Sequence, residues 1–342
     1  MISKIPGIAL ALTLAAALGA CGGGGSDSSD GASSGSTTTG GTGSTGSTST
    51  TSSGTGLVTT APATTYASGS AEATAFALVN SSRLACGFGA LTQNASLDTA
   101  ASNHATYLVD RLEEGVVAGH TEDSTLSGYT AATAAQRATL AGYYWSVISE
   151  DLAYYSPNAN YRTGLVRSLF ATVYHLASMV DGSRDAGISI KVAPSGTQYA
   201  VMEWLSGTAS TAQQQQTTSL VTYPCDGSTG VQPYMGTESP EPFTNLGFTS
   251  GSSVGQPLYF KAPKGSTIVL TAASLTAASG TAITTTLYHY TDDPQGELAA
   301  NQAFVIPRSA LSLGTTYTAS VTGTVDGTAF TRTFSFSTEA SW

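Results

Sequence analysis

The chain has 342 residues, of which only 10% are charged, and a formal net charge of −10. This length allows more than one domain. An acidic balance argues against nucleic acid and anionic lipid headgroups as binding partners.

The first 20 residues have the pattern of a bacterial export signal. One basic residue, Lys4, precedes the apolar run Ile8–Leu18, which is too short for a hydrocarbon core that needs roughly 20 helical residues. The following Gly-Ala-Cys21 resembles the end of a lipobox, so Cys21 is expected to become the lipidated first residue of the mature chain. An ordinary secretory signal that ends near a cysteine is the alternative. Loss of Lys4 changes the net charge from −10 to −11.

A linker is predicted for residues 21–70, because Gly, Ser and Thr dominate residues 22–56. Such a segment has too little apolar surface to offset the entropy of ordering. A coil of this length spans roughly 30–35 Å. We therefore expect a lipid-anchored protein of the bacterial cell envelope that faces the periplasm or the exterior. Gly22 favours the outer membrane, because the aspartate that retains some lipoproteins at the inner membrane is absent.

Two of the three cysteines, Cys86 and Cys225, remain once Cys21 carries lipid. An oxidising compartment favours a disulfide between them. In the loop-entropy model such a bridge stabilises the fold by about 4–5 kcal/mol. Two free thiols are the alternative.

Residues 71–232 read as helices followed by strands. Apolar residues at helical spacing predict helices over 72–84 and 163–179, and Asn94 can cap a third helix whose shared face holds Leu97, Ala101, His104 and Leu108. Strands are expected over 187–192, 199–205 and 219–224. This order predicts an α+β domain with an antiparallel sheet.

Residues 233–342 begin with a proline-rich boundary and continue in short alternating runs at 266–270, 284–290, 317–322 and 330–336. The spacing predicts an all-β sandwich of about seven strands. Leu311–Tyr317 resembles the corner of immunoglobulin-like and fibronectin-III-like modules, in which a tyrosine hydroxyl satisfies a nearby backbone group. Nothing in this region indicates chemistry, so a spacer or adhesive module is expected.

Several motifs in the first part occur in the order typical of one family. They are Asn80–Arg83, Gly89–Leu91, Leu97 to His104, Gly119-His120, Arg137 with Ala141–Tyr143, Ser149–Ala153, and Tyr174-His175 with Asp185–Ile190. Together they resemble the CAP superfamily of cysteine-rich secretory, antigen 5 and pathogenesis-related-1 proteins, in its bacterial SCP-domain form. The resemblance implies an α-β-α sandwich over about 71–225.

In that family two histidines and two glutamates line a cleft that can hold a divalent metal such as zinc. By resemblance His120, Glu150 and His175 occupy three of these positions. The second glutamate is missing, because residues 151–174 contain no Glu. Glu122 is our candidate to replace it, and Asp151 stands where the family has asparagine.

Two imidazoles and one carboxylate can bind zinc and leave a position open for water or ligand. In the alternative, His120 and His175 only hydrogen-bond Glu150 in a structural polar cluster. His104 is expected to be a half-buried packing residue, and His289 a surface or cross-strand residue. The tyrosines near Glu150 either line a groove or pack over the sheet; they are Tyr143, Tyr144, Tyr154, Tyr155 and Tyr161.

We expect a non-enzymatic surface protein whose cleft of His120, Glu122, Glu150 and His175 binds a small apolar ligand or an envelope or host polymer. The family resemblance implies lipids and sterols as ligands, and a glycan is the polymer we consider. One alternative is a metal-dependent hydrolase with Glu150 as general base. Another is a structural or adhesive envelope protein with a vestigial cleft.

Overall fold

The computed structural model describes residues 56–155, 161–194, 200–209, 213–216, 218 and 220–341. The predicted signal peptide, Cys21 and most of the linker lie outside these residues. Within them, no helix has both the length and the apolar character needed to cross a membrane.

Helix α1 (Ala71–Cys86) follows the predicted helix at 72–84. The Ser70 hydroxyl accepts a hydrogen bond from the Ala73 amide at 3.0 Å and caps the first turn. Gly87 ends the helix in the left-handed conformation, with φ of 83°, which costs glycine little. The buried face carries Phe76 and Val79.

Helix α2 (Ala95–Glu113) begins at the predicted cap, where the Asn94 side chain accepts from the amides of Ser96 and Leu97. Its predicted face is buried, His104 included. Helix α3 (Ala134–Leu140) begins with a reciprocal capping box between Thr133 and Gln136. A long connection separates the two helices and carries His120 and Glu122.

The single helix predicted over 163–179 is wrong, because the chain forms two helices, α4 (Tyr161–Phe170) and α5 (Tyr174–Met179). The Glu238 carboxylate accepts hydrogen bonds from the amides of Val173 and Tyr174 at 2.8 Å each. These amides form the start of α5, so a carboxylate from a distant segment caps a new helix there. The local apolar pattern contains no sign of this cap.

A four-stranded sheet forms the centre of this part, in the order β1-β3-β4-β2. Its strands are β1 (Thr92–Gln93), β2 (Val147–Tyr155), β3 (Asp185–Val192) and β4 (Ala200–Thr208). Strand β4 pairs antiparallel with both β2 and β3, which confirms the two predicted strands at 187–192 and 199–205. Strand β2 was not predicted as a strand, although it carries Glu150.

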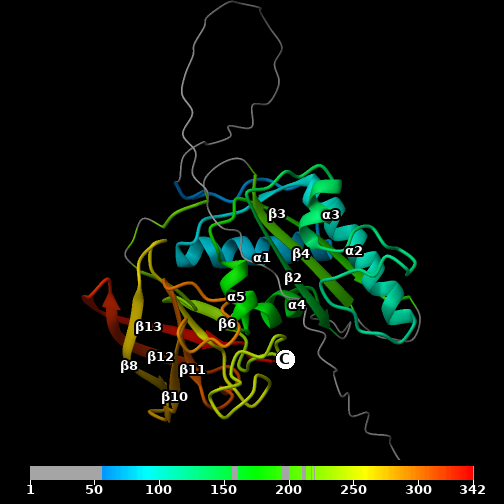
Figure 1. The fold of residues 1–342 in the computed structure, drawn as a ribbon. Coiled ribbons are helices and arrows are strands. Elements are labelled where there is room, and N and C mark those ends of the chain that lie inside the picture. Colours follow the sequence, from blue (N-terminus) through cyan, green and yellow to red (C-terminus); the bar gives the residue numbers. More distant parts are fainter. Residues whose placement is uncertain are drawn as a thin grey trace, which may run out of the picture. The chain divides into compact units, whose positions relative to one another are not determined.

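Helices cover both faces of this sheet (Figure 1). On β4, Leu205 faces α2 and packs with Leu97, whereas its neighbour Trp204 faces α1, with its ring 5.5 Å from that of Phe76. Successive residues of a strand point to opposite faces, so the sheet separates two layers of helices. The mixed helix and strand content agrees with the predicted α+β class.

Two further sheets follow, with the strand orders β10-β11-β7-β5 and β6-β13-β12-β8-β9. The first holds β5 (Val221–Tyr223), β7 (Leu258–Lys261), β10 (Thr285–His289) and β11 (Gln302–Pro307). The second holds β6 (Ser228–Val231), β8 (Ile268–Ala277), β9 (Ala282–Ile283), β12 (Thr316–Val325) and β13 (Thr328–Thr338). Both sheets contribute to one apolar core, which includes Phe260, Val305, Val321 and Phe334. The Ser312 amide donates to the Tyr317 hydroxyl at 2.7 Å, the kind of bond expected of this corner.

The predicted strand at 219–224 does not join the sheet of β3 and β4. It forms β5 and pairs with β7, because its apolar side chains Val221 and Tyr223 belong to a core that reaches from α1 to β7 and β11. Phe88, just after α1, stacks on Tyr259 of β7 with ring centroids 6.3 Å apart. The helical part and the later sheets therefore share apolar contacts.

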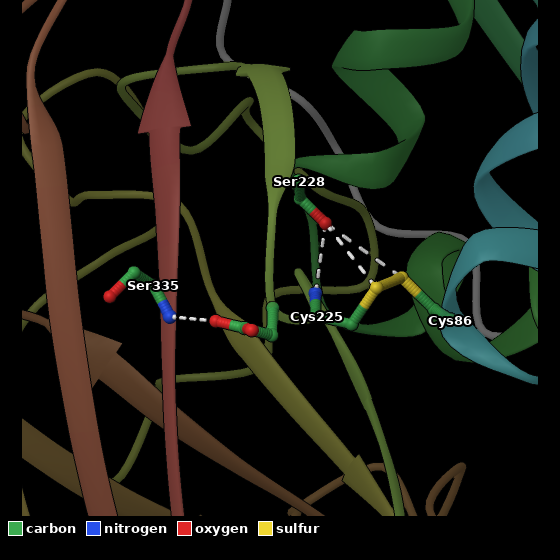
Figure 2. Close-up of a disulfide and its surroundings, with 5 residues drawn as sticks. Cys86, Cys225, Ser228 and Ser335 are labelled. Carbon is green, nitrogen blue, oxygen red and sulfur yellow. Dashed lines mark hydrogen bonds between the residues drawn. A yellow bond between two sulfur atoms is a disulfide. The ribbon is translucent and has the colours of Figure 1, made fainter.

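The predicted disulfide between Cys86 and Cys225 is confirmed. Figure 2 shows it joining the end of α1 to the segment between β5 and β6, with the Ser228 hydroxyl beside both sulfur atoms. The neighbouring Asp226 carboxylate accepts from the Ser335 amide of β13 at 2.8 Å. The disulfide thus fastens α1 to a chain segment that is itself hydrogen-bonded to β13.

Candidate functional site

His120 and Glu150 meet, as expected. The Nδ1 atom of His120 lies 2.9 Å from Oε1 of Glu150, and the His120 side chain is 47% exposed while that of Glu150 is 4% exposed. Arg137 contacts the second oxygen of Glu150 and also donates to the His120 carbonyl at 3.0 Å. The Arg137 guanidinium therefore holds the Glu150 carboxylate and also the backbone of His120, the histidine that this carboxylate binds.

Three elements bring these groups together. Strand β2 holds Glu150 on the face that α2 and α3 cover, α3 supplies Arg137, and the connection between α2 and α3 supplies His120. Arg137 is buried and also donates to the Ala131 carbonyl at 3.2 Å. The capping box thus fixes the start of α3, and Arg137 of this helix binds backbone carbonyls of the connection that precedes α3.

Glu122 is buried more deeply than His120, and it pairs with His104 instead of His120. Its Oε1 atom lies 2.9 Å from Nδ1 of His104, and both side chains are fully buried. Glu122 also accepts from the amides of Thr130 and Ala131. The expected half-buried position of His104 is wrong, because Glu122 supplies the polar partner that allows its complete burial.

Glu203 completes the cluster and was missed in the sequence. It lies on β4 opposite Leu152 of β2, so it points to the same face as Glu150. Burial and the charge of Glu150 raise the pKa of Glu203 well above its usual value. Burial alone would raise the pKa of Glu150, but hydrogen bonds from His120 and Glu203 and the charge of Arg137 lower it.

His175 lies elsewhere, on α5. Its Nδ1 atom is 2.9 Å from Oε1 of Glu238 and 3.1 Å from the Thr172 hydroxyl. Helix α5 packs on the face of β2 opposite to Glu150, where Ser178 donates to Asp151 at 2.9 Å. The alternation of a paired strand sends Glu150 and Asp151 to opposite faces, which explains why His175 does not join His120.

Asp151 and His175 titrate unusually. Burial raises the pKa of Asp151 to about 7, although His175 and the Ser178 hydroxyl act in the opposite direction. Burial lowers the pKa of His175, but the hydrogen bond and charge of Glu238, together with the charge of Asp151, raise it overall. This face therefore holds two groups whose protonation is coupled to the fold.

One ion held jointly by His120, Glu150 and His175 does not fit this arrangement. Within the described part of the chain, three metal-ligating side chains come close together only at His104, Glu150 and Glu203, whose donor atoms lie within 4.8 Å of one another. The sequence signal that could have identified Glu203 is its position as a single charged residue within the apolar run of β4. Glu238 lies 63 residues beyond His175 and had no local signal.

The tyrosines around Glu150 divide between packing and exposure. Tyr143 is buried and donates to Asp185 at 2.9 Å, and Tyr154 donates to the Ala118 carbonyl at 2.6 Å. Tyr144 is 76% exposed. The side chain of Tyr161 lies outside the described residues. His289 of β10 contacts Asp292 and the backbone of Leu270 on β8, a strand of the other sheet.

Exposed apolar side chains concentrate in the segment that carries His120. Of the eleven large hydrophobic residues exposed in the described part, seven lie between residues 116 and 145. They are Val116, Val117, Leu126, Tyr129, Leu140, Tyr144 and Trp145. Such an accumulation is typical of interaction surfaces when it forms one patch.

No family model and no curated protein matches this chain. Among solved structures, an outer surface protein from Borrelia burgdorferi is 16% identical with a TM-score of 0.33, over 42% of this chain and 96% of that chain. A DUF4426 family protein from Pseudomonas aeruginosa is 18% identical with a TM-score of 0.24, over 36% of this chain and 90% of that chain. At these TM-scores neither likeness bears on the function of the site.

Proposed function

We propose that this chain is a lipid-anchored envelope protein of the CAP type that binds an apolar ligand beside His120 and does not catalyse a reaction. The motif order described above and the helices on both faces of a largely antiparallel sheet support the CAP assignment. The Leu18–Cys21 motif supports the anchor. Lipids and sterols are the first ligand class, and wall glycans the second.

The accumulation of exposed apolar side chains on residues 116–145 carries this proposal. An exposed hydrophobic residue alone needs no explanation, but seven within residues 116–145 do. The same segment holds the half-exposed imidazole of His120. Exposed apolar side chains together with one polar ring suit an amphipathic molecule whose hydroxyl hydrogen-bonds the free ring nitrogen of His120.

Glu150 is a poor general base, which argues against the hydrolase alternative. His120 occupies one of its oxygens and Arg137 the other. Its pKa is lowered by hydrogen bonds from His120 and Glu203 and by the charge of Arg137, which outweigh burial, whereas an efficient base has a pKa near the working pH. The same ion pair suits a binding role, because it fixes the orientation of the His120 ring.

Trp145 provides a direct test, because it is 42% exposed whereas Trp204 is fully buried. The purified chain is titrated with a long-chain fatty acid, a sterol and a soluble peptidoglycan fragment while tryptophan fluorescence is recorded. We expect a blue shift with the fatty acid or the sterol, as burial removes the Trp145 ring from water. Tyr144→Ala is expected to weaken binding at least tenfold.

Leu313→Ala serves as the matched control, since Leu313 is also exposed but lies in the turn before β12, outside residues 116–145. This variant is expected to bind as the wild type does. Equal affinity of Tyr144→Ala, Leu313→Ala and wild type would contradict the proposed surface. Absence of binding by all three ligand classes would favour the structural or adhesive alternative.

A further inference from the structure

The orientation of His104 is the first observation that points to a second site. Glu122 accepts from Nδ1 of His104 at 2.9 Å, which leaves Nε2 as the unprotonated nitrogen of a neutral ring. No described residue hydrogen-bonds the buried Nε2 atom. A carboxylate behind a histidine with a free nitrogen in front is the arrangement found in metal sites.

Glu203 supplies the second observation. Its side chain is completely buried, and among the described residues only Glu150, which shares a hydrogen bond with it, contacts its carboxylate. Two carboxylates buried side by side repel each other unless a proton or a cation lies between them. Its closest ionisable neighbours are Glu150 and His104.

The charges in the cluster do not balance. Three carboxylates, those of Glu122, Glu150 and Glu203, surround one buried cation, Arg137. Two chemistries can correct this imbalance. Glu203 can keep a proton and share it with Glu150, or a divalent cation can bind between the two carboxylates and Nε2 of His104.

We propose that His104, Glu150 and Glu203 form a buried site for a divalent cation of the zinc type. One imidazole nitrogen and two carboxylate oxygens are ligands that zinc accepts. The ion would link α2, β2 and β4, the three elements that carry these residues. Their donor atoms lie within 4.8 Å of one another, so ligand distances of about 2.0–2.2 Å require the side chains to close slightly. Glu122 orients the imidazole and does not touch the ion.

The test uses the full mature chain, purified without chelators. Metal content is measured by mass spectrometry before and after dialysis against EDTA, and again after addition of Zn²⁺. We expect about one Zn²⁺ per chain after reconstitution and a melting temperature that falls when the ion is removed. Co²⁺ in place of Zn²⁺ is expected to give the visible absorption of a low-coordinate site.

Variants separate the site from its surroundings. Glu203→Gln and His104→Gln are expected to lose the ion, and Glu122→Gln to bind it about 10–100-fold more weakly because the ring loses its orientation. His175→Gln is the control and keeps full metal content, since His175 lies across the sheet. Circular dichroism shows whether each variant is folded, and Glu203→Asp replaces Glu203→Gln if that variant does not fold.

Two results would overturn the proposal. One is a folded wild type that binds no Zn²⁺ or Co²⁺ and melts at the same temperature with and without EDTA. The other is a Glu203→Gln variant that is more stable than the wild type at pH 8 while metal changes neither protein. That second result would show that Glu150 and Glu203 share a proton only.

Discussion

The two faces of strand β2 treat adjacent carboxylates in opposite ways. Glu150 faces α2 and α3, where Arg137 and His120 hold it, and its pKa is lowered. Asp151 faces α5, where the Ser178 hydroxyl donates to it and burial raises its pKa to about 7. Since both side chains are nearly or fully buried, burial alone does not decide protonation. The hydrogen bonds from His120 and Glu203 and the charge of Arg137, all on one face, do.

The difference between the faces is also one of composition. The Glu150 face contains a cluster of charged and histidine side chains beneath α2, whereas the Asp151 face adjoins the apolar core that includes Trp204 and Leu176. One edge strand therefore supports a polar site and an apolar core at the same time. Period-two alternation makes this possible within two consecutive residues.

The largest effect is expected from removal of the cation on the Glu150 face. Arg137→Ala leaves Glu122 and Glu150 buried without their compensating charge, so the free energy of unfolding should fall by about 3–5 kcal/mol. Urea unfolding followed by circular dichroism measures this change. Arg308→Ala, at an exposed arginine, is the control and should cost well under half as much; equal losses in the two variants would contradict the role given to Arg137.

Asp151 is expected to make the stability of the protein depend on pH. Its pKa is raised in the folded state to about 7 from 3.8, so the folded protein binds this proton more tightly than the unfolded chain. The unfolding free energy should therefore fall by up to about 1.4 kcal/mol per pH unit as the pH rises from about 4 to 7. His175, whose pKa is also raised, adds stability at low pH that is lost in the same direction.

Asp151→Asn should remove most of this decline and be more stable than the wild type at pH 8, by about 2–3 kcal/mol. Denaturant unfolding at several pH values, with the wild type beside the variant, measures both slopes. Parallel curves for the two proteins would show that Asp151 does not titrate in this window.

A smaller effect is expected from the carboxylate that begins α5. Glu238→Ala leaves the amides of Val173 and Tyr174 without their acceptor and should cost about 1–3 kcal/mol. It also removes the group that raises the pKa of His175, so that pKa should fall. An NMR titration of the His175 ring measures the shift. An unchanged His175 titration in the folded variant would argue against this pairing.

The smallest effect on stability is expected at the proposed ligand surface. Tyr144→Ala removes a ring that is 76% exposed, so the free energy of unfolding should change by less than about 0.5 kcal/mol. Binding is expected to weaken in the same variant. A large loss of stability would mean that Tyr144 serves packing and not recognition.

Local signals predicted the parts of the fold that depend on neighbouring residues. The Asn94 cap, the buried face of α2, strands β3 and β4 and the Cys86–Cys225 bridge all follow from patterns within the chain. The break between α4 and α5 does not, because the carboxylate that caps α5 comes from Glu238, more than 60 residues away. The pairing of β5 with β7 is a long-range choice of the same kind.

The candidate site was predictable only in part, for the same reason. The contact between His120 and Glu150 was expected, but Glu150 was not recognised as part of a strand. Without that strand, its alternation with Asp151 was not available to show that His175 lies across the sheet. Glu203 required knowledge of the register between β2 and β4, which places it on the Glu150 face.

A carboxyl ¹³C NMR titration of Glu150 and Asp151 in the folded wild type tests the comparison of the two faces most directly. We expect the Glu150 carboxyl to stay ionised well below pH 4, whereas the Asp151 carboxyl gains its proton near pH 7. If both carboxyls titrate together near pH 4, the environments assigned to the two faces of β2 are wrong.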